Sequence, residues 1–324
     1  MGWSSLFFFR AMRSGQHWSP RLAVFGDMGN VNAQSLPFLQ EEAQKGTIDA
    51  VLHVGDFAYD MDSDNARVGD EFMRQIEPVA AYVPYMTCVG NHENRYNFSN
   101  YVNRFSMVDK SGNVNNHFFS FDMGPAHIIG LSTEFYFFVE YGITQIANQF
   151  KWLEEDLKEA TKPENRAKRP WIITMEHVPH PSQTQIRKGI PLVHLFGLED
   201  LFYKYGVDLE FWAHEHSYER LWPVYDRKAR LFVYNGSYDK PYTNPGAPVH
   251  IITGSAGCQE RLDPFKTNPA NWSAVRYKDY GYTVMTVHNR THLNLKQFSA
   301  EKEGQILDDI TIIKNYHGPY FSRG

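Results

Sequence analysis

The sequence predicts an α/β fold in which parallel strands are joined by helices. Residues 22–25 and 50–54 are short apolar segments that each run directly into Gly-Asp. Residues 32–45 between them have a helical pattern, with Asn32 as its expected cap and Gly46 as its stop. Such a strand–helix–strand unit forms a parallel pair through a right-handed crossover.

The elements that follow repeat this alternation. Residues 85–89 are predicted to form a third strand ending at Gly90-Asn91-His92, and residues 128–131 a further strand. Apolar residues at every third or fourth position from 146 to 157 predict a helix that ends near residue 160. Residues 171–175 and 207–212 are predicted strands around a short helix at 198–205, and a β-rich pattern begins at residue 231. The basic residues 162–169 are predicted to form a solvated loop.

Chain length, hydrophobic content and net charge limit the possible classes of protein. The chain has 324 residues, of which 42% are hydrophobic, so it is long enough to bury a large core in one domain. A formal net charge of -5 argues against nucleic acid or an anionic membrane surface as a partner. No transmembrane segment is predicted, and the oligomeric state is left open.

Cysteine and sequon usage give a further expectation. Cys88 and Cys258 are predicted to be small buried residues, although a disulfide between them is compatible with the sequence. Four glycosylation sequons, at Asn97, Asn235, Asn271 and Asn289, favour a secretory route and N-glycans. The first ten residues form a poor signal peptide.

Five short segments offer ligands for two metal ions, and each follows a strand-like segment. Together they supply carboxylate, phenol, amide and imidazole groups, the ligands that a pair of hard or borderline cations prefers. In α/β sheets such groups meet beyond the carboxyl ends of the strands. Alone, each segment would be read as a turn or a buried polar residue. The set is Asp27, Asp56, Tyr59, Asn91, His177, His214 and His216.

This set resembles the calcineurin-like metallophosphoesterase pattern. The usual pattern has a histidine two residues after the first aspartate, where this chain has Gly29, and Tyr59 follows the second aspartate. That exchange resembles the purple acid phosphatases, in which a tyrosinate binds ferric iron. Residues 18–27, 65–70, 218–220 and 251–257 are similar to the animal iron/zinc purple acid phosphatase-like proteins. The resemblance implies a four-layer αββα sandwich with the metal site at the carboxyl ends of the strands.

The resemblance also implies a ligand set for each metal. A ferric ion would bind Asp27, Asp56, Tyr59 and His216, and a divalent ion (zinc, iron or manganese) would bind Asp56, Asn91, His177 and His214. Tyrosine normally titrates near ~10, so only a strong Lewis acid would keep Tyr59 ionised in acid. The same ion lowers the pKa of bound water. His214 and His216 would face one side on an extended strand, whereas in a loop they could flank two metals.

The activity implied is that of an acid phosphatase. It would hydrolyse phosphate monoesters, either small-molecule esters or phosphoproteins, with metal-bound hydroxide as the nucleophile. His92, next to a ligand, is expected to bind a phosphate oxygen or to help protonate the leaving group. Glu93 and Glu215 are expected to support the ligands or to be solvated. The implied location of the full-length form is secreted or lysosomal.

Two departures from the family matter. The loop after His177 is shortened and leaves His180 as the nearby catalytic candidate, and Glu176 stands where the family commonly has glycine. Residues 1–17 resemble the remnant of an N-terminal fibronectin- or immunoglobulin-like β-domain, and residues 18–320 form the metallophosphoesterase domain. The alternatives are a phosphodiesterase or nucleotide hydrolase on the same scaffold, and a truncated, non-catalytic metal-binding protein.

Overall fold

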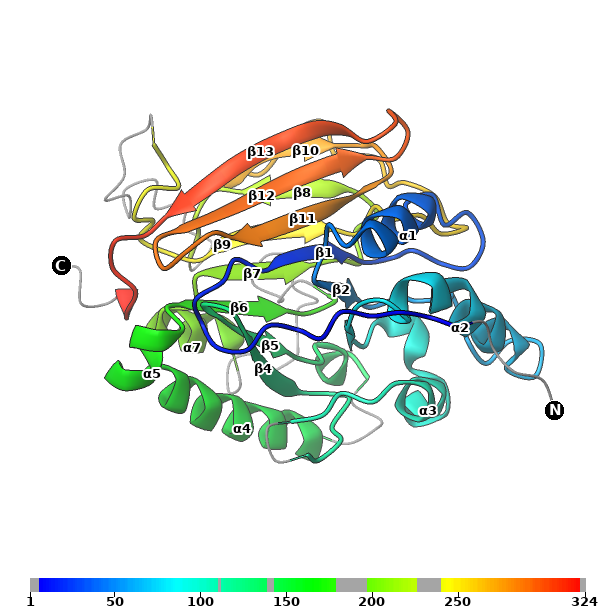
Figure 1. The fold of residues 1–324 in the computed structure, drawn as a ribbon, viewed down its shortest axis with the longest axis horizontal. Coiled ribbons are helices and arrows are strands. Elements are labelled where there is room, and N and C mark those ends of the chain that lie inside the picture. The colour runs from blue at the N-terminus through cyan, green and yellow to red at the C-terminus, as the bar shows by residue number, and fades with distance from the viewer. Residues whose placement is uncertain (1–5, 110–111, 139–142, 179–196, 226–239, 321–324) are drawn as a thin grey trace.

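Two mixed β-sheets pack face to face and carry helices on their outer faces (Figure 1). The computed structural model describes residues 6–109, 112–138, 143–178, 197–225 and 240–320. Within these residues the first sheet has the strand order β13-β12-β11-β1-β2-β3, and the second has the order β10-β8-β9-β7-β6-β5-β4. The predicted four-layer α/β sandwich is therefore confirmed.

The strands of the first sheet are β1 (Arg21–Phe25), β2 (Ala50–Val54), β3 (Tyr85–Cys88), β11 (Gly281–Val287), β12 (His292–Ser299) and β13 (Gln305–Ile313). Those of the second are β4 (Phe119–Met123), β5 (Ala126–Gly130), β6 (Trp171–Met175), β7 (Leu209–Trp212), β8 (Tyr218–Leu221), β9 (Val249–Thr253) and β10 (Ser273–Tyr277). Strands β1, β2 and β3 are parallel to one another, as are β5, β6, β7 and β9. The carboxyl ends of each parallel set therefore meet at one edge.

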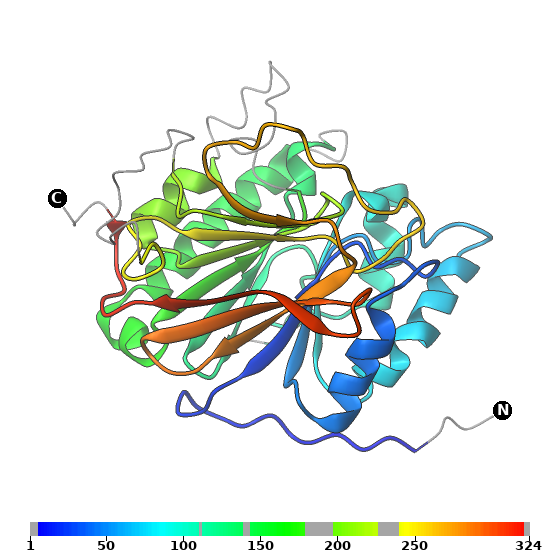
Figure 2. The same cartoon turned by 90° about the horizontal axis from the view of Figure 1, so that it is seen from above.

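The helices are α1 (Leu36–Lys45), α2 (Arg67–Ala80), α3 (Arg95–Arg104), α4 (Thr144–Ala160), α5 (Pro163–Lys168) and α7 (Leu198–Tyr205). Short 3₁₀ turns, η1 (Asn91–Glu93) and η2 (Glu134–Tyr136), follow β3 and β5. Figure 2 shows α1 and α2 on the opposite side of the sheets from α4 and α7. The structure also contains α2 and β4, which the sequence analysis did not predict.

One apolar core fills the space between the sheets. It contains Leu22 and Val24 of β1, Ile173 of β6, Phe211 of β7 and Met285 of β11, all with no exposed surface. A second cluster joins the outer faces of the sheets to the helices. This burial on both faces explains why the parallel strands are almost continuously apolar.

Two local predictions were wrong. Helix α1 begins at Leu36, and Asn32 lies outside it in a left-handed conformation (φ 65°). Residues 163–168 form helix α5 rather than part of a solvated loop. The Arg166 side chain of this helix is buried against Asp208, with Nη2 3.1 Å from Oδ2. The basic residues of this segment therefore divide between solvent and an interior ion cluster.

The described residues before β1 contain no strand. Phe8 and Phe9 are 73% and 76% exposed. Phe7 instead packs edge-on against Tyr82, with the ring centroids 6.0 Å apart. The assignment of residues 1–17 to a β-domain remnant stays a prediction. Across the described ranges, every helix is too short or too polar to cross a membrane.

An ion triad built around the buried His127 joins the edge of the second sheet to α4. The His127 ring on β5 lies between Asp122 of β4 and Asp156 of α4, with each nitrogen 2.8 Å from a carboxylate oxygen. Arg169 also contacts Asp122, at 3.1 Å. Burial alone would lower the pKa of His127, but the two hydrogen-bonded carboxylates raise this pKa above its ordinary value. The protonated ring therefore binds both carboxylates.

Candidate metal centre

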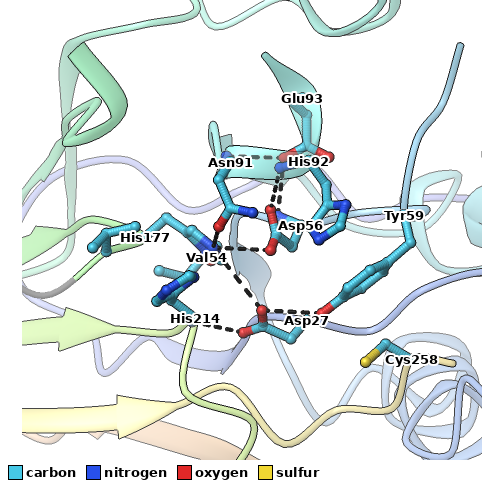
Figure 3. Close-up of polar contacts among 12 residues, drawn as sticks. Asp27, Val54, Asp56, Tyr59, Asn91, His92, Glu93, His177, His214 and Cys258 are labelled. Atoms are coloured by element: carbon cyan, nitrogen blue, oxygen red, sulfur yellow. Dashed lines mark hydrogen bonds and ion pairs between the residues drawn. The ribbon is translucent and has the colours of Figure 1, made fainter. Parts of the chain in front are cut away.

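The seven predicted ligands converge where the parallel strands of both sheets end, and Figure 3 labels all of them except His216. Asp27, Asp56 and Asn91 follow β1, β2 and β3, and Tyr59 lies in the turn after Asp56. On the second sheet, His177 follows β6, and both His214 and His216 follow β7. The topology therefore joins segments that are far apart in the sequence at one edge.

Tyr59, Asp27 and His216 form the first donor group. The Tyr59 hydroxyl is 2.8 Å from His216 Nε2 and 3.2 Å from Asp27 Oδ1, and His216 Nε2 is 3.4 Å from the same Asp27 oxygen. Ligands at right angles around an ion with bonds of about 2.1 Å lie about 3 Å apart. The three atoms thus have the spacing of neighbouring ligands on one ion.

Asp56, His177, Asn91 and His214 form the second donor group. His177 Nε2 is 3.1 Å from Asp56 Oδ2 and 3.2 Å from Asn91 Oδ1. One ligand atom each of Asp56, His177 and His214 lies within 4.8 Å of the other two. His177 Nε2 is also 4.0 Å from Asp27 Oδ1 of the first group, so the two groups adjoin. His214 and His216 therefore belong to different donor groups, the arrangement expected if they lie in a loop and not on an extended strand.

Hydrogen bonds fix the orientation of two of the imidazole rings. His177 Nδ1 donates to the Val54 carbonyl oxygen at 2.8 Å, and His216 Nδ1 donates to the Arg261 carbonyl oxygen at 2.9 Å. A carbonyl oxygen only accepts, so the proton of each neutral ring is on Nδ1, and Nε2 keeps its lone pair. Both lone pairs point into the donor groups, as metal-ligating histidines require.

The backbone at the ligands is unusual. Asp27, Asp56, Tyr59 and His214 all have positive φ, between 51° and 68°, a conformation that non-glycine residues rarely adopt. Such residues cluster at functional sites, where surrounding contacts hold them. Close packing also explains the glycine before Asp56, since a Cβ on Gly55 would collide with the His177 ring. The loops are therefore shaped around the donor atoms.

The electrostatics fit a cation at Tyr59. Burial together with the Asp27 and Asp56 carboxylates raises the pKa of Tyr59 far above its ordinary value. Although burial lowers it, the contact with Asp27 raises the pKa of His216 to about 12. A buried phenol beside two carboxylates ionises only if a strong Lewis acid binds its oxygen. The donor set and its chemistry thus fit a pair of metal ions, one of them strongly charged.

Glu93 supports both metal loops, a role that the sequence analysis left undecided. It is 3% exposed, and its carboxylate accepts the backbone N–H groups of Asp56, Phe57 and Gly90 at 3.0, 3.0 and 2.9 Å. These bonds join the turn after β2 to the turn after β3. Its position three residues after Gly90 is the spacing of a capping interaction, and this was the signal available in the sequence.

His92 lies beside the donor groups. Its ring centroid is 4.4 Å from that of Tyr59, and its Nδ1 is 3.1 Å from Asp60 Oδ1. Its backbone N–H donates to Asp56 Oδ1 at 2.9 Å, which leaves Oδ2 for a metal. Nε2 is 3.7 Å from Glu260 Oε1. The ring is thus near the metal ligands, as predicted, whereas His180 lies outside the described residues.

Glu176 does not enter the centre. Neither carboxyl oxygen of Glu176 has a hydrogen-bond partner among the described residues, so the group makes no hydrogen bond to a residue of either donor group. It is fully buried, and burial and the Glu210 carboxylate raise the pKa of Glu176 well above its ordinary value. The raised pKa favours the neutral carboxyl group, which adds no unwanted charge to the site.

The fold and the donor groups define the class of the chain: a metallophosphoesterase with adjoining sites for two metal ions. Residues 20–218 match the calcineurin-like phosphoesterase family, and residues 247–309 match the iron/zinc purple acid phosphatase-like protein C family. The chain belongs to the calcineurin-like phosphoesterases, within their purple acid phosphatase branch.

Curated relatives and a solved structure agree with this family. Mouse acid phosphatase type 7 is 59% identical over 324 residues, which cover 97% of this chain and 72% of the relative. Human acid phosphatase type 7 is 57% identical, with 98% and 73% covered. A purple acid phosphatase from yellow lupin seeds superimposes with a TM-score of 0.77 at 25% identity. The match covers 97% of this chain and 57% of the lupin chain.

Family membership carries the general activity. The chain is a phosphoric monoester hydrolase whose dimetal centre contains iron. The predictions of family, fold and phosphatase activity are confirmed at this level.

Proposed function

We propose that this chain hydrolyses phosphate monoesters at acid pH with a ferric and a divalent ion. The ferric ion would be held by Asp27, Asp56, Tyr59 and His216, and the divalent ion (zinc, iron or manganese) by Asp56, Asn91, His177 and His214. The observation that carries the proposal is the pair of adjoining donor groups, of which only the first contains a phenol. A phenolate ligand favours the more highly charged ion.

The protein residues have distinct tasks. When bound, such a metal pair lowers the pKa of water and stabilises charge on the attacking and leaving oxygens. Glu93 and the carbonyl partners of His177 and His216 hold the ligands in place before substrate arrives. Although burial lowers the pKa of His92, the Asp56 and Asp60 carboxylates raise it, and Asp60 accepts from Nδ1. The protonated ring then keeps an Nε2–H group that can donate to a phosphate oxygen or to the leaving oxygen.

Hydrolysis of an aryl phosphate from about pH 4 to about pH 8 tests this proposal. The protein is reconstituted with ferric iron and a divalent ion, and Asp56→Asn is compared with Asp64→Asn, a surface carboxylate that is 63% exposed. We expect turnover to peak in acid, to be lost in Asp56→Asn and to persist in Asp64→Asn. Absence of turnover in folded, metal-loaded protein would refute the proposal. Retention of monoesterase activity by Asp56→Asn would refute the ligand assignment.

We further propose small-molecule phosphate esters or phosphoproteins as substrates, and a secretory route with N-glycans. The exposure of Asn97 and Asn271 supports glycosylation of these sequons. Asn289 is exposed too, but its Oδ1 accepts the backbone N–H groups of Thr291 and His292 at 2.8 and 3.0 Å. Asn235 lies outside the described residues. A mass decrease on glycosidase treatment of protein from secretory cells tests this proposal.

A further inference from the structure

A pocket outside the metal centre lies between α3, η2 and the start of α4 (Figure 1). Its volume is about 410 Å³, which is within the range of ligand-binding pockets in proteins. None of the described residues that line it belongs to either donor group. The residues that matter for its chemistry are Tyr96, Asn97, Ser99, Asn103, His117, Phe135 and Gln145.

A strained turn at the start of α3 forms one wall of this pocket. Tyr96, Asn97 and Phe98 all have a left-handed backbone, with φ of 53°, 55° and 60°. Non-glycine residues keep this conformation only where their surroundings impose it, and they cluster at ligand-binding sites. Phe98 is fully buried against His117 and Phe135, with ring centroids 5.3 and 6.2 Å away. The buried ring thus holds the turn, while Tyr96 and Asn97 stay exposed and line the pocket.

The Tyr96 ring is held in place although it is 69% exposed. The Arg95 guanidinium lies 5.7 Å from the ring centroid, a cation–π contact. Arg95 Nε is in turn 3.7 Å from Asp62 Oδ2, in the turn that follows β2. A large aromatic ring fixed in a pocket wall offers a surface on which the apolar face of a ligand can pack.

The chemistry of the pocket fits a neutral, hydroxyl-bearing ring. Burial lowers the pKa of His117 to about 4, so this ring is neutral at neutral pH, and the other described lining residues carry no charge. A phosphate group would therefore find no cationic partner among them. The side-chain amide and hydroxyl groups come from Asn97, Ser99, Asn103 and Gln145. Such groups beside aromatic rings match a sugar, which has C–H faces and polar substituents.

A sugar carried by Asn97 itself has the shortest route to this pocket. Asn97 and Ser99 are the first and third residues of a glycosylation sequon, and both line the pocket. The first N-acetylglucosamine of a glycan would be bonded to Asn97 Nδ2, within the pocket wall. A short tether gives an effective concentration in the millimolar range, so a contact that is weak for a free sugar becomes populated.

We propose that the pocket binds the first N-acetylglucosamine of a glycan on Asn97 and that this sugar holds α3 against η2. This role rests on the proposed glycosylation of Asn97. Both segments lead to ligands of the proposed divalent ion. Helix α3 begins four residues after Asn91. Thr133 Oγ1, just before η2, accepts the backbone N–H of Val178 at 3.0 Å, and Val178 directly follows His177.

Hydrogen exchange in residues 95–104 measures how often α3 opens. Metal-loaded, full-chain protein from secretory cells is treated with an endoglycosidase that leaves one sugar on each glycan. It is compared with Ser99→Ala and Asn97→Gln, which carry no sugar at this site. We expect exchange to be about tenfold faster in both variants, the ratio for an effective concentration about ten times Kd. Asn271→Gln, at an exposed sequon outside the pocket lining, is the matched control and should leave exchange unchanged.

Tyr96→Ala separates binding in the pocket from mere attachment of a sugar. In this background Ser99→Ala should no longer speed exchange, and an undiminished effect would overturn the inference. Peptide mass spectrometry that finds Asn97 unmodified would overturn the glycosylation of this residue and the inference together. A glycan on Asn97 with equal exchange in all forms would overturn the inference alone. An equal increase in Asn271→Gln would show a general effect of glycans and would also overturn it.

Discussion

The substitution Asp208→Asn tests whether a buried ion cluster holds the second sheet together. Asp208 is fully buried immediately before β7, and it accepts from Arg166 Nη2 at 3.1 Å and from the Ile172 N–H at 2.8 Å. Its other oxygen pairs with Lys314 and lies 3.3 Å from His317 Nδ1. The cluster thus joins α5, β6, β7 and the segment after β13.

Asparagine removes the only carboxylate in this cluster of described residues and leaves two buried cations. Loss of one partner from a buried ion pair typically costs about 3–5 kcal/mol of unfolding free energy, because the remaining charge is uncompensated. Urea unfolding at neutral pH measures the difference from the wild type. Asp64→Asn is the surface control, since its pair with Arg67 is 63–68% exposed and such pairs contribute about 0–1 kcal/mol.

The pH dependence gives a second readout for Asp208→Asn. Although burial raises it, the Lys314 and Arg166 charges hold the pKa of Asp208 well below its ordinary value of 3.8. For a lowered carboxyl pKa, the stabilisation is complete above the unfolded pKa and is lost only as pH falls through the folded pKa. The gap between wild type and variant should therefore persist from neutral pH to about pH 5. A gap below about 1 kcal/mol, or one that closes by about pH 5, would refute the reasoning.

Three further predictions concern the metal loops, the ion triad and the metals. Glu93→Gln places an amide N–H against backbone donors and should weaken metal binding by about 10–100-fold in a metal titration, whereas Glu215→Gln, on an exposed residue, should leave it unchanged. The pKa of His127 is raised in the folded state, so the stabilisation from its ion triad is complete below the ordinary histidine pKa of 6.5 and is lost as pH rises through the folded pKa. In urea unfolding, the stability advantage of the wild type over His127→Gln should therefore shrink as pH rises. A stability difference that stays constant with pH would contradict this prediction. Removal of the metals with a chelator should lower the unfolding free energy by about 2.7 kcal/mol relative to protein at a metal concentration of 100 times Kd, and an unchanged urea midpoint would show that the metals do not bind the native state preferentially.

The sequence predicted the parallel strands, and it singled out polar residues that the structure brings together beyond the strand ends, because both signals are local. An apolar segment that ends in Gly-Asp specifies both a buried strand and a polar turn beyond it, and β2 occupies the predicted residues. Strand β6, which is followed by Glu176 and His177, also occupies the predicted residues. Helix α2 lacks such signals. It starts after Ala66, which has a φ of 63° and makes no side-chain cap, and it contains Pro78. Its amphipathic pattern is therefore not framed by recognisable ends.

The wrong predictions concern residues whose surroundings are set by distant parts of the chain. Arg166 lies in a basic segment that locally indicates solvent, yet its partner Asp208 is 42 residues away. Cys258 is buried and unpaired with Cys88, as predicted, but its contact with Asn32, 226 residues earlier, was not visible in the sequence. Local charge and hydropathy describe the average fate of a residue type, whereas the burial of a single residue depends on its tertiary partners.

The proposed ligand sets also explain why the family builds its centre between two sheets. Asp27, Asp56, Tyr59 and Asn91 follow strands of the first sheet, whereas the three histidines follow strands of the second. Each ion would therefore take ligands from both sheets, and each would cross-link them at the edge of the apolar core. A shift of one sheet against the other would misplace donors on both ions at once. Packing between the sheets and metal affinity are then coupled, so destabilisation of β6 and β7 through Asp208→Asn should also weaken metal binding, although no ligand is changed.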